Sequence, residues 1–303
     1  MKKEQILKPC VNKEHGLFIA HARAMRYSFK TLSLHTYCLN YFYQYIESRG
    51  IVGWTRVTRQ HLLDYLGYMQ KKGLSKASMA VFLRPVRLFF RYLEEQQKIF
   101  INPAKDLSFK AEVRLPTVLS EEEVRRMLDA PDTGRARGVR DKAFMELAYS
   151  TGMRRAELIQ LDLADINTAD ASVRFVGKGG KERMLPIGKS AMRWLNEYVS
   201  KARVELLEGS ENKALWVKQG GGRLNYDCVQ CFLTLHKRKA GITRKVSCHD
   251  FRRAFATHML QHGAGPVDVQ HLLGHADLHH LRSYLCLTIA DLKKIHSASV
   301  VGK

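Results

Sequence analysis

The chain has 303 residues, and its 50 Lys and Arg against 29 Asp and Glu give a formal charge of +21 at pH 7. A chain of this length can form two domains with sizeable cores, and its apolar runs fall short of the ~18 residues that a membrane span needs. The basic residues run from Lys2 to Lys303, which favours a nucleic acid as the polyanionic partner over a membrane surface. On charge alone, a merely basic soluble protein remains the alternative.

The start of the chain and its cysteines indicate where the protein works. The first residues, MKKEQ, are not followed by the hydrophobic region of a signal peptide. The six cysteines are scattered, as expected for free thiols in a reducing compartment. We therefore expect a cytoplasmic protein with no membrane partner.

The first third of the chain is predicted to be helical, because apolar residues recur at helical spacing. A first helix is expected around 17–25. Ser33, Thr58 and Ser75 are predicted to cap the next helices, since their hydroxyls accept bonds from unpaired amides of a first turn. Pro85 lies inside the last pattern and should kink or divide that helix. The segment is therefore predicted to be a bundle of four or five helices.

The helical pattern stops at Asn102-Pro103. The segment 110–118 has no hydrophobic period and contains Pro116, so we interpret it as a linker. Ser120 and Glu123 then have the spacing of a capping box, in which each side chain accepts a bond from the other residue's amide. The predicted organisation is a helical N-terminal domain at 1–109, a linker at 110–118 and a C-terminal domain at 119–303.

The C-terminal domain is predicted to be mostly helical with one small antiparallel sheet. A helix over 142–149 is expected to end at Thr151-Gly152. Two short strands, 173–176 and 183–187, flank the glycine-rich run 177–180, which favours a hairpin. Later helices are expected around Leu235, over 255–260 and 267–273, and near Leu292. The fold class is thus mainly α, with an N-terminal helical bundle and a mixed α+β C-terminal domain.

This domain holds the side chains that cutting a phosphodiester bond without a metal requires. The reaction needs a nucleophile, cations that stabilise the phosphate oxygens and an acid that protonates the leaving oxygen. Arginine suits the second task because its guanidinium binds two phosphate oxygens and stays charged. The candidates lie on separate elements: Arg154 after a helix end, Lys178 at the hairpin tip, His249 and Arg252 at a helix start, His275 at a helix end, and Tyr284.

These segments resemble the tyrosine recombinase family, the phage integrases and Xer-type enzymes. The matching features are a TG-x-R-x-x-E-L box from Thr151, a lysine in a GKG hairpin, an H-x-x-R box from His249, an LLGH box from Leu272 and Tyr284 at the usual distance. Any one box would be weak evidence, whereas all of them in order are specific. The resemblance spans about 120–296, and the first third is similar to the family's SAM-like core-binding domain.

The resemblance implies how the cations act. Arg154 and Arg252 would clamp the scissile phosphate, and His275 would orient it. Glu157 would position Arg154 rather than carry a proton. Arg155 adds a cation beside Arg154.

A covalent step is implied as well. Tyr284 would attack phosphorus to give a 3′-phosphotyrosine, and Lys178 would protonate the departing 5′ oxygen. His249 would bond a non-bridging oxygen or help to move the tyrosine proton. A phenol with a reference pKa near ~10 needs cationic neighbours to be a nucleophile at neutral pH. Because the phosphotyrosine retains the energy of the phosphodiester, rejoining needs no ATP, and we expect no cofactor and no metal.

The implied partner is double-stranded DNA, gripped between the two domains. The resemblance implies a homotetramer on two DNA sites, and the amphipathic segment 288–295 is a candidate for packing on a neighbouring subunit. The DNA target, and the choice between integration, excision, dimer resolution and inversion, are not encoded legibly in one sequence.

Two other functions stay open. A type IB topoisomerase-like enzyme would share the chemistry but relax DNA as a monomer. A DNA-binding accessory protein with a decayed site would bind DNA and form no covalent species. Leu285-Cys286 follow the tyrosine where many relatives have Thr-His, so we expect its immediate packing to differ from theirs.

Individual residues also have alternative interpretations. Tyr284 has apolar neighbours and is compatible with a core tyrosine, and Lys181 is a rival of Lys178. Histidine pairs at helical spacing, and one cysteine pair, have spacings seen in zinc sites. For the cysteine pair we expect instead two buried thiols on a helix. These pairs are His258 with His262, His271 with His275, and Cys228 with Cys231.

Overall fold

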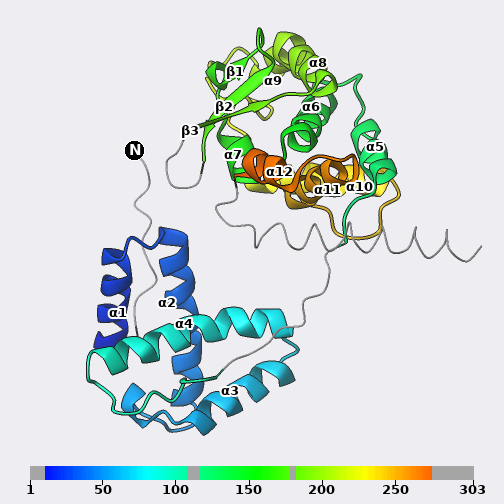
Figure 1. Ribbon diagram of the computed structural model, residues 1–303. Helices are drawn as coiled ribbons and strands as arrows, with labels where there is room; N and C mark the ends of the chain where they lie inside the picture. The colour runs from blue at the N-terminus through cyan, green and yellow to red at the C-terminus, as the bar shows by residue number, and fades with distance from the viewer. Residues whose placement is uncertain (1–10, 108–116, 178–181, 275–303) are drawn as a thin grey trace, which may run out of the picture. The chain divides into compact units, whose positions relative to one another are not determined.

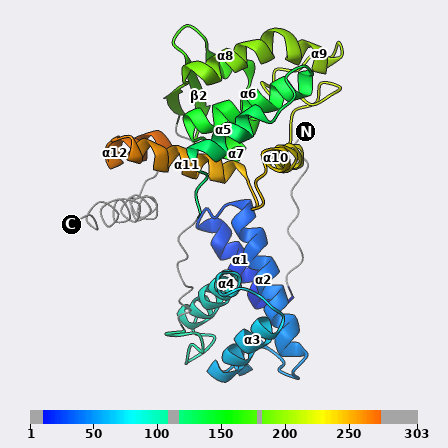
Figure 2. The ribbon, with the colours of Figure 1, turned by 90° about the vertical axis from the view of Figure 1, so that its right-hand side faces the viewer.

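A computed structural model of the chain describes residues 11–107, 117–177 and 182–274. The chain divides into two compact units, Met1–Arg114 and Leu115–Lys303 (Figures 1 and 2). Most of the predicted linker at 110–118 lies outside the described residues. The predicted mainly helical fold with a small antiparallel sheet is confirmed.

The first unit consists of helices packed around aromatic side chains. Its elements are α1 (Lys13–Ala24), α2 (Phe29–Glu47), the 3-10 turn η1 (Trp54–Arg56), α3 (Arg59–Lys71) and α4 (Lys76–Glu95). The Thr58 and Ser75 caps are confirmed, since the hydroxyls accept bonds from the amides of His61 and Ser78. Trp54 packs edge-on against Phe89, with ring centroids 4.7 Å apart. This core is continuous from α1 to α4.

One prediction about this unit is wrong, and a second, that Pro85 kinks or divides its helix, is wrong as to the division. Ser33 caps no helix: α2 begins at Phe29, and the Ser28 hydroxyl accepts from the Thr31 amide at 3.2 Å. Pro85 does not divide α4, which runs on to Glu95. The reason is tertiary, because the apolar face of α4 is buried on both sides of the proline and its packing outweighs one lost backbone bond.

The second unit has a three-stranded antiparallel sheet of order β1-β2-β3 among helices. The predicted strands are confirmed, whereas the two-residue β1 was not predicted because it is too short for a recognisable alternation. In β2 and β3, Phe175 pairs with Arg183. The elements are α5 (Glu121–Asp129), α6 (Ala136–Thr151), α7 (Arg155–Gln160), the 3-10 turn η2 (Leu163–Asp165), β1 (Ile166–Asn167), β2 (Ser172–Val176), β3 (Glu182–Pro186), α8 (Lys189–Glu197), the π-helical turn η3 (Tyr198–Ala202), α9 (Arg203–Leu207), α10 (Tyr226–Lys239), α11 (Cys248–Gln261) and α12 (Pro266–Leu273).

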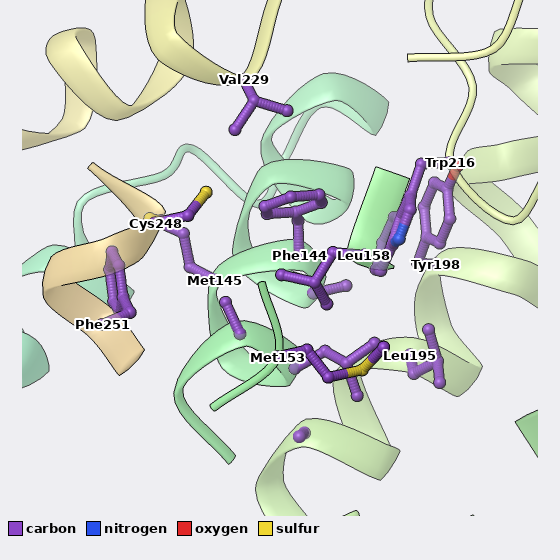
Figure 3. Close-up of a cluster of buried hydrophobic side chains, with 14 of the residues drawn as sticks. Phe144, Met145, Met153, Leu158, Leu195, Tyr198, Trp216, Val229, Cys248 and Phe251 are labelled. Carbon is purple, nitrogen blue, oxygen red and sulfur yellow. The ribbon is translucent and has the colours of Figure 1, made fainter. Parts of the chain in front are cut away.

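Helix α6 is the centre of this unit and is buried on nearly every side. Helices α5, α8, α9 and α11 all pack against it. Figure 3 shows Phe144 of α6 within the core, with Trp216 and Tyr198 beyond it. The Tyr198 hydroxyl donates to the Leu215 carbonyl at 2.9 Å and accepts from the Val217 amide at 3.0 Å. Because α6 is held all round, the turn that follows its last residue has a fixed position.

The cysteine prediction is partly wrong. Cys228 and Cys231 lie on α10 as expected, but Cys228 is only partly buried and Cys231 is exposed. The buried residues of this helix include Val229 and Phe232, and Cys228 packs at the edge of the same core. Among the described residues, no helix is both long and apolar enough to cross a membrane.

Candidate active site

The turn between α6 and α7 positions the first predicted arginine. Gly152 ends α6 in the left-handed conformation, with φ +60°, which glycine adopts without strain. A Cβ atom there would lie 2.5 Å from a ring carbon of Phe255 and 3.0 Å from a methyl of Leu273. Glycine thus lets the chain turn tightly against α11 and α12. Arg154 follows two residues later.

Arg154 precedes α7 and is held by Glu157, as the sequence predicts. The Arg154 amide donates to one Glu157 carboxylate oxygen at 2.7 Å, and Nη1 donates to the other at 2.9 Å. The Glu157 side chain is 9% exposed and that of Arg154 is 36% exposed. The buried carboxylate therefore fixes a guanidinium that stays accessible to a ligand.

Arg252 lies on α11 and is 2% exposed. Its Nη1 donates to the Gly152 carbonyl at 2.6 Å, and its Nη2 donates to the Leu273 carbonyl at 2.7 Å. Arg252 thus joins the Arg154 turn to the end of α12. The family resemblance implies only a phosphate-binding role for Arg252, and the structure adds this tie between two segments.

His249 lies at the start of α11, one turn before Arg252. Ser247 caps this helix together with Asp250, whose carboxylate accepts from the Ser247 amide at 2.8 Å. Partial burial lowers the pKa of His249, and the positive charges of nearby arginines, Arg154 and Arg252 among them, lower it further. His249 and Arg252 thus share the first two turns of α11, and Arg252 bonds the turn that leads to Arg154.

Arg183 is a further cation at this site, and sequence reasoning missed it. It lies on β3, and its Nη2 donates to the carbonyls of His271 and, at 3.0 Å, Leu272. Burial lowers the pKa of Arg183. The negative charge of Glu157 counteracts this effect, and the positive charge of Arg154 adds to it. One signal was present: on a strand, Arg183 shares a face with the buried Leu185.

The remaining predicted residues lie outside the described residues. These are Lys178, its rival Lys181, His275 and Tyr284. Their neighbours are described: the hairpin strands end at Val176 and begin again at Glu182, and α12 ends at Gly274.

The histidines of the zinc interpretation have other contacts. His258 is buried on α11, and its Nδ1 bonds the Tyr149 hydroxyl at 2.9 Å. Nε2 of His262 lies 3.2 Å from a carboxylate oxygen of Glu121. Within 11–107, 117–177 and 182–274, no three His, Cys, Asp or Glu side chains gather as a metal site.

Comparisons with known proteins place this geometry in context. The chain matches the Phage integrase family over residues 117–289 and the Phage integrase, N-terminal SAM-like domain, over residues 17–97. It is 38% identical to the tyrosine recombinase XerD of Pseudomonas putida over 79% of this chain and 80% of that protein. It is 39% identical to the tyrosine recombinase XerC of Pelotomaculum thermopropionicum over 78% of both chains.

Solved structures share the fold. The post-cleavage complex of the XerH site-specific recombinase with its difH substrate matches with a TM-score of 0.73, at 22% identity, over 94% of this chain and 84% of that one. A lambda integrase dimer bound to a core site matches with a TM-score of 0.71, at 18% identity, over 89% and 93% of the two chains.

Proposed function

The chain belongs to the phage integrase family of tyrosine recombinases, and from this we propose that it cuts and rejoins duplex DNA at specific sites through a covalent bond to Tyr284. Arg154 and Arg252 bind the scissile phosphate in this proposal, and His275 orients it. His249 helps to remove the proton from the tyrosine hydroxyl, and Lys178 protonates the leaving 5′ oxygen. The reaction conserves the bond energy in a 3′-phosphotyrosine, so it uses neither ATP nor a metal.

One observation carries the proposal most strongly. His249 and Arg252 share the first two turns of α11, and Arg252 donates to the carbonyl of Gly152, two residues before Arg154. Two distant stretches of sequence thus meet where α6 ends and α11 begins. A site with several fixed cations stabilises the charge that develops on phosphate in the transition state. The N-terminal end of α11, a 14-residue helix, adds amides and a dipole that favour an anion.

The first unit supplies a second surface for DNA. Arg84, Arg87 and Arg91 lie on one exposed stripe of α4, spaced by three and four residues. The stripe is about 10 Å long, because a helix rises about 1.5 Å per residue. Lys105 adds a cation across the same shallow cavity. We propose that this stripe binds DNA phosphates.

Salt dependence tests the role of the stripe. Changing Arg84, Arg87 and Arg91 together to Gln should lower the slope of log Kobs against log[salt] by about 3, because each phosphate contact releases about one counterion. Fluorescence anisotropy on a labelled duplex measures this slope. The salt concentration should run from about 50 to about 300 mM, a range wide enough to resolve the slope. Arg125→Gln is the control, since that guanidinium is already paired with Glu122 at 2.8 Å. An unchanged slope in the triple variant would place the DNA contacts elsewhere.

The pH dependence of cleavage tests His249. Its pKa lies below the ordinary 6.5, so the neutral ring that accepts a proton persists as pH falls past that value. Single-turnover cleavage should hold its rate from pH 7.5 to 6.5 and decline only at lower pH. His249→Gln should slow cleavage about 10²-fold and abolish the decline of the rate at low pH, the acid limb of the profile. His262→Gln should retain this acid limb. A limb that survives His249→Gln would assign the titration to another group.

The assembly is also a proposal. We infer a homotetramer on two DNA sites, with the segment 288–295 packing on a neighbouring subunit. A chain shortened after Thr288 should bind a single site as tightly as the full chain but fail to pair two sites in native gels. Full pairing by the shortened chain would contradict this assignment.

Recombination itself tests the function. A pool of nicked duplexes with randomised core sequences, selected for covalent trapping, identifies a cleavable site. Two copies of that site on one plasmid should then recombine with EDTA present and ATP absent. Relaxation of a plasmid that lacks the site would favour the topoisomerase-like alternative, and binding without any trapped species would favour the accessory protein.

A further inference from the structure

Arg183 connects two elements that each lead into a predicted catalytic residue. It lies on β3, the second strand of the hairpin, and its guanidinium reaches the end of α12. The ring of Phe175, its partner on β2, lies 5.8 Å from the guanidinium carbon.

The end of α12 is bound by two arginines. The last carbonyls of a helix have no partner within it and carry a partial negative charge. Here the carbonyls of His271 and Leu272 accept from Arg183, and that of Leu273 accepts from Arg252. The helix end is therefore fixed to the hairpin on one side and to α11 on the other.

Gly274 makes room for this contact. It ends α12 in the left-handed conformation, with φ +64°. A Cβ atom on Gly274 would lie 1.6 Å from Nη1 of Arg183, so a side chain there would displace the guanidinium from this position. His275 is the next residue. The contact of Arg183 thus comes directly before the predicted phosphate-orienting histidine.

The electrostatic surroundings of Arg183 place it at the site. The charges of both Glu157 and Arg154 act on its pKa. Arg183 therefore lies near the predicted phosphate clamp, while the carbonyls of α12 hold its guanidinium. Its guanidinium donates to backbone oxygens of another segment, and such bonds hold segments of the chain together.

We propose that Arg183 is a positioning residue, which locks the hairpin that carries Lys178 against the end of α12 that carries His275. This inference rests on the proposed function. In the cleavage step, the Tyr284 hydroxyl loses its proton to His249 and its oxygen forms a bond to phosphorus. The bond from phosphorus to the 5′ oxygen breaks, and that oxygen takes a proton from Lys178. When Arg183 is lost, the hairpin is no longer held, and proton delivery suffers first.

A substrate that needs no proton separates this role from a general loss of structure. With sulfur in place of the bridging 5′ oxygen, the bond from phosphorus to sulfur breaks and a thiolate leaves with the electron pair. A thiol has a pKa of about 8.5, so a thiolate leaves without an acid. Arg183→Gln should cleave the ordinary duplex about 10²-fold more slowly than the unchanged chain, by the usual contribution of a general acid. On the sulfur duplex, Arg183→Gln should be less than about tenfold slower than the unchanged chain, because no general acid is needed there.

Two further variants make the test specific. Arg183→Lys keeps the charge but lacks the planar fork that binds two carbonyls, so it should behave like Arg183→Gln. Arg174→Gln changes an exposed arginine of the same hairpin and should cleave both duplexes at the unchanged rate. Melting temperature and duplex binding, measured on each full-length variant, report folding.

Each outcome bears on the proposal. Equal losses on both duplexes would overturn it and leave Arg183 a general structural residue, and a wild-type rate for Arg183→Lys would overturn it in favour of charge alone. If Arg183→Gln does not fold, the Lys variant carries the same comparison of the two duplexes. If the unchanged chain cleaves neither duplex, the proposed function fails instead.

Discussion

Tyr284→Phe is expected to abolish the covalent DNA complex while leaving duplex binding within about twofold. The change removes one oxygen, the nucleophile, and losing the nucleophile of a covalent enzyme costs about 10⁴-fold or more. Phenylalanine differs from tyrosine by the hydroxyl alone, so folding should be unaffected. Denaturing gels of trapped duplex measure the complex, and anisotropy measures binding.

The matched control is Tyr226→Phe on α10. That ring stacks under Arg155, with the guanidinium carbon 4.5 Å from its centroid, and the Phe variant keeps a ring in the same place. It should trap DNA at the unchanged rate. A Tyr284→Phe chain that still formed a covalent complex would show that another residue attacks phosphorus.

Arg154→Ala should slow cleavage about 10²- to 10³-fold, the usual effect of removing one fixed donor to transition-state charge. Arg154 differs from the buried Arg252 in that its side chain is accessible and its known partner is the Glu157 carboxylate. Removing it therefore takes away a phosphate-binding group without breaking the tie between α6 and α12. Thermal stability should change by little, and the loss should appear in the single-turnover rate.

The neighbouring Arg155 provides the control. It is the next residue along the chain and carries the same charge, but its guanidinium lies over the Tyr226 ring. Arg155→Ala should cleave within about threefold of the unchanged rate, as expected for a charge outside the site. Equal losses for Arg154→Ala and Arg155→Ala would mean that the local net charge matters and not a directed clamp.

Local sequence signals predicted much of the fold. The capping box of Ser120 and Glu123 is present, with bonds of 3.1 and 2.9 Å, because its chemistry is complete within one turn. The glycine-rich hairpin and the end of α6 at Gly152 were predictable for the same reason. The predictions failed where packing decides: α2 starts one turn before Ser33, and α4 continues through Pro85.

The candidate site was only partly predictable. The sequence boxes supplied the residue types, and the structure brings Arg154, His249 and Arg252 together. No sequence signal showed that Arg252 bonds the Gly152 and Leu273 carbonyls, because those partners are 100 and 21 residues away. Arg183 was missed for the same reason, since its carbonyl partners on α12 are 88 and 89 residues distant.

The central claim is that Tyr284 carries the DNA. A nicked duplex selected as above, incubated with the unchanged chain in EDTA without ATP, should yield a trapped complex. Digestion with trypsin should leave the nucleotide on the peptide of residues 283–293, whose only tyrosine is Tyr284. Mass spectrometry should find it there, linked through a 3′-phosphate. A nucleotide on any other residue, or a 5′-phosphate linkage, would contradict the account.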